Sequence, residues 1–125
     1  MAGPARELHT QQVHYLRKRV NFNDANIAGG VLMGTLPAGA ILVNLNARVT
    51  TAFNAATTNA LNVGTTAGGT QVFTDVATAG ARSPTIPNLA FATDTDLYVA
   101  YAQTGTVATA GLADIVVSYV PNNDL

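Results

Sequence analysis

The clearest structural signal in the chain is the stretch Ile41-Leu42-Val43-Asn44-Leu45-Asn46-Ala47-Arg48-Val49-Thr50. Its odd positions are all apolar, while most of its even positions hold Asn, Arg or Thr. Successive side chains of a β-strand point to opposite faces, so this spacing of two is typical of a strand with one buried and one exposed face. A helix would need a different spacing. We therefore predict a strand here, with residues 41, 43, 45, 47 and 49 on its buried face.

The same alternation recurs at Leu97 to Tyr101 and at Ala113 to Tyr119, where Pro121 prevents continuation. Shorter strand candidates are Val13 to Phe22, Val31 to Leu36, Ala60 to Val63, Thr70 to Val76 and Leu89 to Ala92. The intervening segments are rich in residues that favour turns, and no window shows the apolar spacing of a stable helix. We predict an all-β fold of about eight strands, a jelly-roll-like two-sheet sandwich or a related one.

Composition limits the classes of protein to which the chain can belong. With 125 residues it can bury one ordinary core, so we expect a single domain. The lack of Cys excludes disulfides, thiolate metal sites and Cys nucleophiles. Only 10% of the residues are charged, against about a quarter in typical domains. This low charge suits a protein that packs against other protein surfaces, or a β domain covered by Thr and Asn.

Neither a membrane span nor a signal peptide is expected. The longest uncharged run, residues 25–47, contains several Gly and Asn residues and a Pro, so it cannot form a bilayer-spanning helix. The first residues do not lead into the apolar stretch of a secretory signal. We therefore expect the protein to be made and folded in the cytoplasm.

Basic residues are concentrated at the N-terminus. Residues 1–20 carry four basic and one acidic side chain, a net +3, while the rest carries two basic and six acidic ones, a net −4. We interpret residues 1–19 as an N-terminal arm that leads into the first strand, and residues 20–125 as the sandwich domain. The residues that we expect to bind a partner protein are Leu8, His14, Tyr15, Leu16, Arg17, Lys18 and Arg19.

The cluster Arg17-Lys18-Arg19 admits three interpretations. The charges can protect an edge strand from unwanted pairing, dock on an acidic protein surface, or contact nucleic acid. In a strand, Arg17 and Arg19 share one face and Lys18 takes the other, so they form no continuous stripe along a phosphate backbone. With an isoelectric point near 6.0, we expect no nucleic-acid partner.

The residues that catalysis requires are scarce. The two Ser residues, Ser83 and Ser118, have no nucleophile motif around them, and His9 and His14 are not spaced as a helical metal pair. Asp94 and Asp96 could bind calcium, but the simpler interpretation is that they initiate a turn. We predict no catalytic residue, no metal site, no cofactor and no enzymatic activity.

Several segments resemble a small structural protein of tailed bacteriophages, most closely the capsid decoration, or cement, group. The resemblance lies in residues 36–40, 50–54 through 61–66, 104–111 and 116–120. It implies a β-sandwich that binds the outside of the expanded capsid shell and bridges neighbouring major capsid protein subunits. We expect the protein to act as a homo-oligomer, such as a dimer or trimer, located on the virion exterior after synthesis in the host cytoplasm, with no membrane partner.

An alternative function is a receptor- or carbohydrate-binding module at a virion vertex, neck or fibre, since sandwiches often carry such sites on their end loops. Sugar sites commonly use an exposed aromatic ring, and the chain has no Trp. Tyr98 and Tyr101 fall on opposite faces of one predicted strand, so one of them could be exposed.

Overall fold

The computed structural model describes residues 13–77, 80–82 and 89–121. These residues form eight strands, which are β1 (His14–Asn21), β2 (Val31–Leu36), β3 (Ile41–Thr51), β4 (Thr58–Gly64), β5 (Phe73–Val76), β6 (Gly80–Arg82), β7 (Thr95–Thr104) and β8 (Leu112–Val120). Within the described ranges, no helix has the length and apolarity that crossing a membrane requires.

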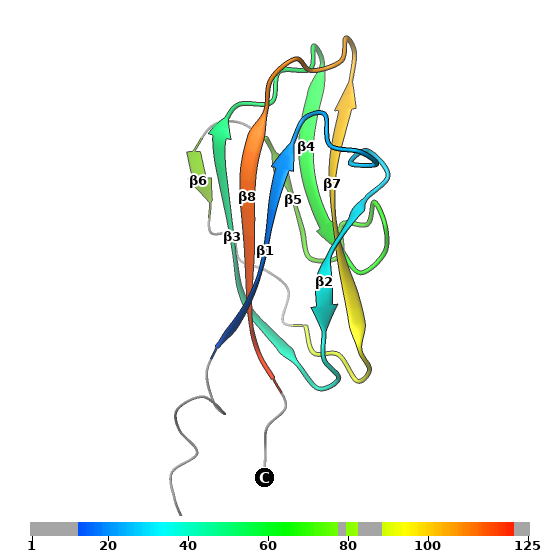
Figure 1. Ribbon diagram of the computed structural model, residues 1–125, viewed down its shortest axis with the longest axis vertical. Helices are drawn as coiled ribbons and strands as arrows, with labels where there is room; N and C mark the ends of the chain where they lie inside the picture. The colour runs from blue at the N-terminus through cyan, green and yellow to red at the C-terminus, as the bar shows by residue number, and fades with distance from the viewer. Residues whose placement is uncertain (1–12, 78–79, 83–88, 122–125) are drawn as a thin grey trace, which may run out of the picture.

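The strands form two four-stranded antiparallel sheets that pack face to face (Figure 1). One sheet has the order β1-β8-β3-β6 and the other the order β2-β7-β4-β5. Successive strands alternate between the two sheets, except for the β4–β5 pair, and the first strand lies beside the last. This connectivity is that of a jelly roll, so the predicted all-β sandwich is confirmed.

The core lies between the two sheets and is built by alternate residues of their strands. In β8, Ala113, Ile115 and Val117 have no exposed surface, whereas Asp114 and Val116 between them are partly exposed. The largest fully buried side chains are Tyr101, Leu36, Leu45, Leu61, Leu97, Ile115, Val20, Val63, Val99 and Val117. Each buried Leu or Val contributes about 1.5–3 kcal/mol by leaving water, which makes this shared core the main source of stability.

A β-bulge reverses the predicted faces at the start of β3. Leu42 pairs with Tyr119 of β8 and Asn44 pairs with the preceding residue of β8, so Val43 is an extra residue in the ladder. Leu42 is therefore buried together with Leu45, while Ile41 and Val43 are 43% and 52% exposed. The expectation that residues 41 and 43 face the core was wrong, because one inserted residue shifts the alternation by one position.

The bulge leads to a direct test by substitution of adjacent residues. We expect Leu42→Ala to lower the free energy of unfolding by about 2–5 kcal/mol, since it leaves a cavity in the core. Ile41→Ala should cost about 1 kcal/mol or less, because that side chain is already partly in water. Urea unfolding followed by circular dichroism measures both values. A larger loss for Ile41→Ala than for Leu42→Ala would contradict the assigned faces.

The strand predicted at Leu89 to Ala92 is absent, and β6 takes the fourth place in its sheet. In that segment only Ala90 forms an isolated bridge, to Ile41. The position beside β3 is occupied by β6, which pairs with Ala47 to Val49. With only three residues, β6 is too short for an alternation to be recognised in the sequence.

Strand β1 includes much of the segment that was interpreted as an arm. Residues 1–12 lie outside the described residues, whereas residues 14–19 belong to β1. The strand pairs with β8 along its whole length, from His14 opposite Tyr119 to Asn21 opposite Leu112. Residues 14–19 therefore form an edge strand of the sandwich.

Candidate functional site

Strand β1 carries six of the seven residues predicted to bind a partner, His14 to Arg19, and the seventh, Leu8, lies outside the described residues. Tyr15, Arg17 and Arg19 are exposed on the outer face of the sheet. Leu16 and Lys18 are half-buried and point to the other side, as the alternation of a strand requires. The predicted site is thus divided between two faces of one strand.

Leu16 fixes how β1 sits against the second sheet. A Cβ atom added to Gly34 of β2 would lie 2.8 Å from a terminal carbon of Leu16, so only glycine allows the leucine to approach this closely. This contact joins the two sheets at the edge formed by β1 and β2. It gives Leu16 a packing role, which leaves the outer-face residues of β1 as the part of the predicted set that can meet a partner.

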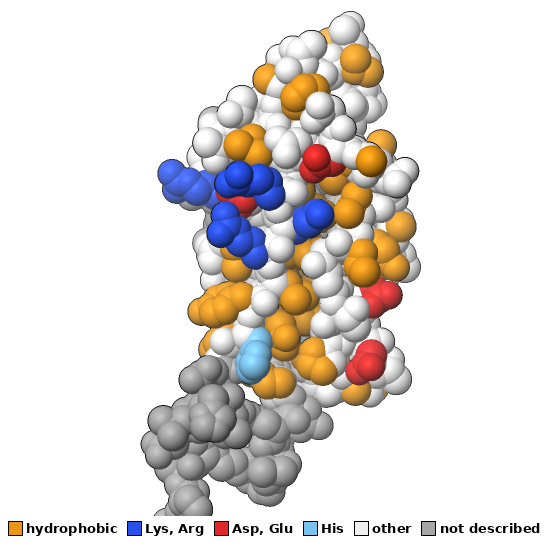
Figure 2. Space-filling model, in the orientation of Figure 1, with side chains coloured by type: hydrophobic (Ala, Val, Ile, Leu, Met, Phe, Trp, Pro, Cys, Tyr) orange, Lys and Arg blue, Asp and Glu red, His pale blue; other side chains and the backbone are white. Residues whose placement is uncertain are grey.

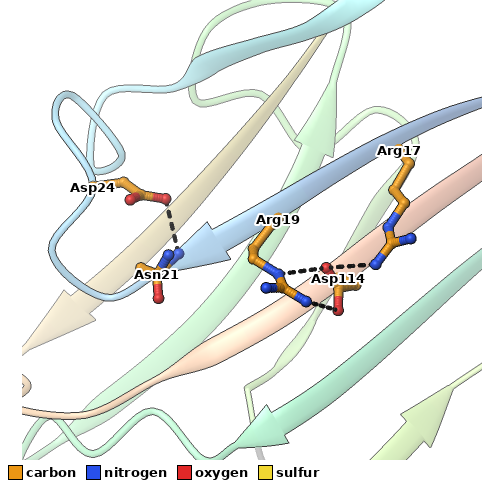
Figure 3. Close-up of polar contacts among 5 residues, drawn as sticks. All are labelled: Arg17, Arg19, Asn21, Asp24 and Asp114. Carbon is orange, nitrogen blue, oxygen red and sulfur yellow. Dashed lines mark hydrogen bonds and ion pairs between the residues drawn. The ribbon is translucent and has the colours of Figure 1, made fainter.

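Arg17 and Arg19 both reach Asp114 on β8 (Figure 3). Nε of Arg19 donates a hydrogen bond to Oδ1 of Asp114 at 3.1 Å, and Nη2 of Arg17 lies 3.3 Å from the same oxygen. The side chains of Arg17 and Arg19 are 63% and 60% exposed, while the Asp114 side chain is only 14% exposed. Two guanidinium groups therefore share one carboxylate and keep an excess of positive charge on this face.

The ion pairs shift the protonation of both partners. The hydrogen bond from Arg19 is the largest cause that lowers the pKa of Asp114, and the same bond raises the pKa of Arg19. Because the arginines are largely in water, solvent screening keeps the contribution of these pairs to stability small. We therefore interpret the pairs mainly as a means of orienting Arg17 and Arg19. The sequence did hint at Asp114, since it lies between two core positions of β8 and must face outward.

Asp114→Asn should make the protein melt at a lower temperature near pH 7, by a margin that is smaller at pH 2. A carboxyl group whose folded pKa is lowered stabilises the fold above its ordinary pKa, which is 3.8. That stabilisation is lost as the pH falls through the folded value. Thermal melts at several pH values measure the margin. A margin of equal size at both pH values would show that the loss does not come from the charge of Asp114.

Exposed apolar side chains lie on the same outer face, toward the other end of β1, β8 and β3. Val13 and Tyr15 are 43% and 64% exposed, and Ile41 and Val43 of β3 flank the end of β8 from its other side. Figure 2 shows the basic side chains gathered at mid-height on one side of the molecule, with hydrophobic side chains below them. We call Tyr15, Val43, Arg17 and Arg19 the outer-face set.

A cavity of about 380 Å³ opens beside the end of β1. It is lined by Lys18, Arg19, Asn21, Asp24, Ala25 and Val31. Within it, Oδ2 of Asp24 accepts a hydrogen bond from the main-chain N–H of Asn21 at 2.8 Å (Figure 3). The lining combines basic, acidic and apolar groups.

The acidic pair Asp94 and Asp96 secures a turn between strands. Oδ1 of Asp94 accepts a hydrogen bond from the N–H of Ala38 at 2.8 Å, and Oδ1 of Asp96 accepts one from the hydroxyl of Thr35 at 2.7 Å. The first bond ties the residue before β7 to the β2–β3 connection, and the second joins the start of β7 to the end of β2. Among the described residues, no group of three or more His, Asp or Glu side chains is placed to hold a metal ion.

The two tyrosines considered for sugar binding have different environments. Tyr101 is completely buried, its ring lies 4.4 Å from that of Phe53, and its hydroxyl donates a hydrogen bond to Asn59. Burial raises the pKa of Tyr101 above its ordinary value, as expected for a core residue. Tyr98 is half-buried on the opposite face of β7. Tyr15, at 64% exposed, offers more ring surface than either.

Comparison with solved structures finds this fold in chains from three phage capsids. A chain of the cyanophage Pam1 capsid asymmetric unit matches with a TM-score of 0.68 and 23% identity, over 97% of this chain and 92% of that one. A chain of the acidic stable capsid structure of Helicobacter pylori bacteriophage KHP30 matches with a TM-score of 0.66 and 16% identity, over 86% of each chain. A chain of the capsid of Ralstonia phage GP4 matches with a TM-score of 0.59 and 18% identity, over 98% of this chain and 91% of that one.

Neither a protein-family model nor a curated protein sequence matches the chain. At identities of 23% and below, what the solved structures share with this chain is its fold. The jelly-roll sandwich described above is therefore a fold that occurs in phage capsids.

Proposed function

We propose that the chain is a non-enzymatic structural protein of a phage particle. It would decorate the exterior of the expanded capsid shell and stabilise it by bridging neighbouring major capsid protein subunits. The observation that supports this most is the extent of the likeness to the Pam1 capsid chain, which covers nearly all of both chains. The likeness is thus between two whole small sandwiches, rather than between this chain and one domain of a larger protein.

The surface of the sandwich fits an adhesive role. The low charge of the chain leaves little electrostatic repulsion between copies, and the outer-face set adds exposed apolar and guanidinium groups on a rigid sheet. Aromatic and arginine side chains are the types that contribute most at protein interfaces. Many copies on one shell, acting as small homo-oligomers, would gain avidity even if each contact were weak.

Binding to shells is the direct test of this proposal. Purified chain mixed with expanded shells that lack it should sediment with them and raise the temperature at which they come apart. The variant Tyr15→Ser/Val43→Ser should bind about tenfold more weakly, because it removes exposed apolar contacts at the interface. Val107→Ser, which changes a 67% exposed residue in the β7–β8 connection, serves as a matched control. A chain that never sediments with shells would contradict the proposal.

The contribution of the arm can be tested without disturbing the sandwich. Removing residues 1–20 would delete β1 and the fully buried Val20, so it would change folding as well as binding. A shortened chain that begins at Val13 removes Leu8 and keeps every described strand. We expect it to melt at the same temperature and to bind shells more weakly, as measured by sedimentation. Equal binding by the full and the shortened chain would exclude residues 1–12, including Leu8, from the contact.

The alternative function, a receptor- or carbohydrate-binding module at a vertex, neck or fibre, is favoured only by the exposed ring of Tyr15. That ring lies on a sheet face rather than on an end loop. Binding of the purified chain to a glycan array, together with a location at one vertex of the particle, would support this alternative over decoration.

A further inference from the structure

The phase of the β1–β8 ladder shows which main-chain groups of β1 lack a strand partner. Opposite residues in an antiparallel pair alternate between hydrogen-bonded and non-hydrogen-bonded pairs. The N–H of Phe22 donates to the carbonyl of Gly111 at 3.1 Å, in continuation of this register. Every second residue before Phe22 therefore belongs to a hydrogen-bonded pair with β8, and Lys18 and Leu16 are among these residues. The main-chain groups of Tyr15, Arg17 and Arg19 therefore point away from β8.

The edge that these three residues present is open in the described structure. At its end, the N–H of Asn21 also points away from β8 and is occupied by Asp24. No hydrogen bond joins the main chain of Tyr15, Arg17 or Arg19 to another described residue. Strand β2 belongs to the other sheet and forms no ladder with β1. The cavity described above lies at the Arg19 end of this edge.

We propose that the free edge of β1 accepts an extended segment of a partner protein as an added strand, and that this segment carries carboxylate side chains opposite Arg17 and Arg19. The main chain of Tyr15, Arg17 and Arg19 would supply the hydrogen bonds, as in other cases of strand addition. The inference deepens the proposed function and rests on it for the identity of the partner, which would be a protein of the shell.

Charge selects this occupant over a second copy of the chain. If two β1 strands paired with each other, Arg17 and Arg19 of one copy would lie opposite or diagonal to arginines of the other. Like charges in such positions oppose pairing, and charged edges are a common protection against self-association. An acidic strand would instead place negative charges opposite the arginines, and each opposite-charge pair strengthens binding by about two- to fivefold. The edge is therefore protected against its own copies and complementary to an acidic segment.

Asp114 orients the two arginine side chains before this partner binds. Arg19 uses Nε and Nη2 toward Asp114, and Arg17 uses one terminal nitrogen. A guanidinium group has five N–H donors, so both arginines keep donors for a second carboxylate. Because Asp114 already holds the side chains near β8, less conformational freedom is lost when a partner binds.

Hydrogen exchange of the full chain, followed residue by residue with NMR, tests the edge. In the free chain the amides of Tyr15, Arg17 and Arg19 should exchange quickly, whereas those of Leu16 and Lys18 should be protected. A synthetic peptide of alternating Asp and Val should slow exchange at the first three and shift their signals. The same peptide with Lys in place of Asp should have no effect.

Four variants separate the possible modes of binding. Arg17→Gln/Arg19→Gln should weaken binding of the Asp peptide by about tenfold. Arg48→Gln removes a charge from the same face but lies on β3, away from the edge, and should change binding by less than about twofold. Tyr15→Pro removes an N–H that points away from β8, which edge strands tolerate, and should bind more weakly than Tyr15→Ala.

The inference would be overturned by equal responses to the Asp and Lys peptides, by no response at Tyr15, Arg17 and Arg19, or by an equal loss of binding in the Arg48→Gln variant. Slow exchange at these amides in concentrated free chain would point to a second copy at the edge and would also overturn it. Since the peptide experiment uses no shells, it is independent of the proposed function. If the chain binds shells but its edge amides do not respond to the peptide, the proposed function stands and the inference fails. If the edge amides respond but the chain does not bind shells, the inference stands and the proposed function fails.

Discussion

Strand β8 lies between β1 and β3 and pairs with both, and this double pairing keeps their sheet together over the core. On one side it pairs with β1 over eight positions, and on the other it forms a long ladder with β3. Its inner face contributes Ala113, Ile115 and Val117, all without exposed surface. Its outer face presents Asp114, which binds two arginines of β1. The same strand therefore stabilises the core and orients the candidate binding groups.

The edge position of β1 gives its basic residues two compatible roles. A strand with unpaired main-chain groups is prone to join other strands, and charged side chains oppose this. The same charges favour a partner of opposite sign, so protection and recognition are two effects of one arrangement. If the chain decorates a shell as proposed, an edge that rejects its own copies but accepts an acidic segment would direct assembly toward the shell.

The likeness to phage capsid chains agrees with the general features of the molecule. A jelly-roll sandwich is a rigid body with two broad faces, and it requires no catalytic site to fulfil a structural role. Uncharged side chains cover most of this one, which suits close contact between neighbouring proteins. The identities of 16–23% show that this shape is kept with few shared residues, as expected where the pattern of apolar positions determines the fold.

Alternation of apolar residues along the chain was sufficient to identify the all-β class, most of the strands and the face shared by Arg17 and Arg19, because strand periodicity is a local property. The tertiary structure decided the rest. The bulge at Val43 arises from pairing with β8, far along the chain, and it reversed the expected faces of Ile41 and Leu42. The partnership of Arg19 with Asp114 joins residues 95 positions apart, and the open edge of β1 depends on which strands pair. Contacts between distant segments leave no spacing in the sequence from which they could be inferred.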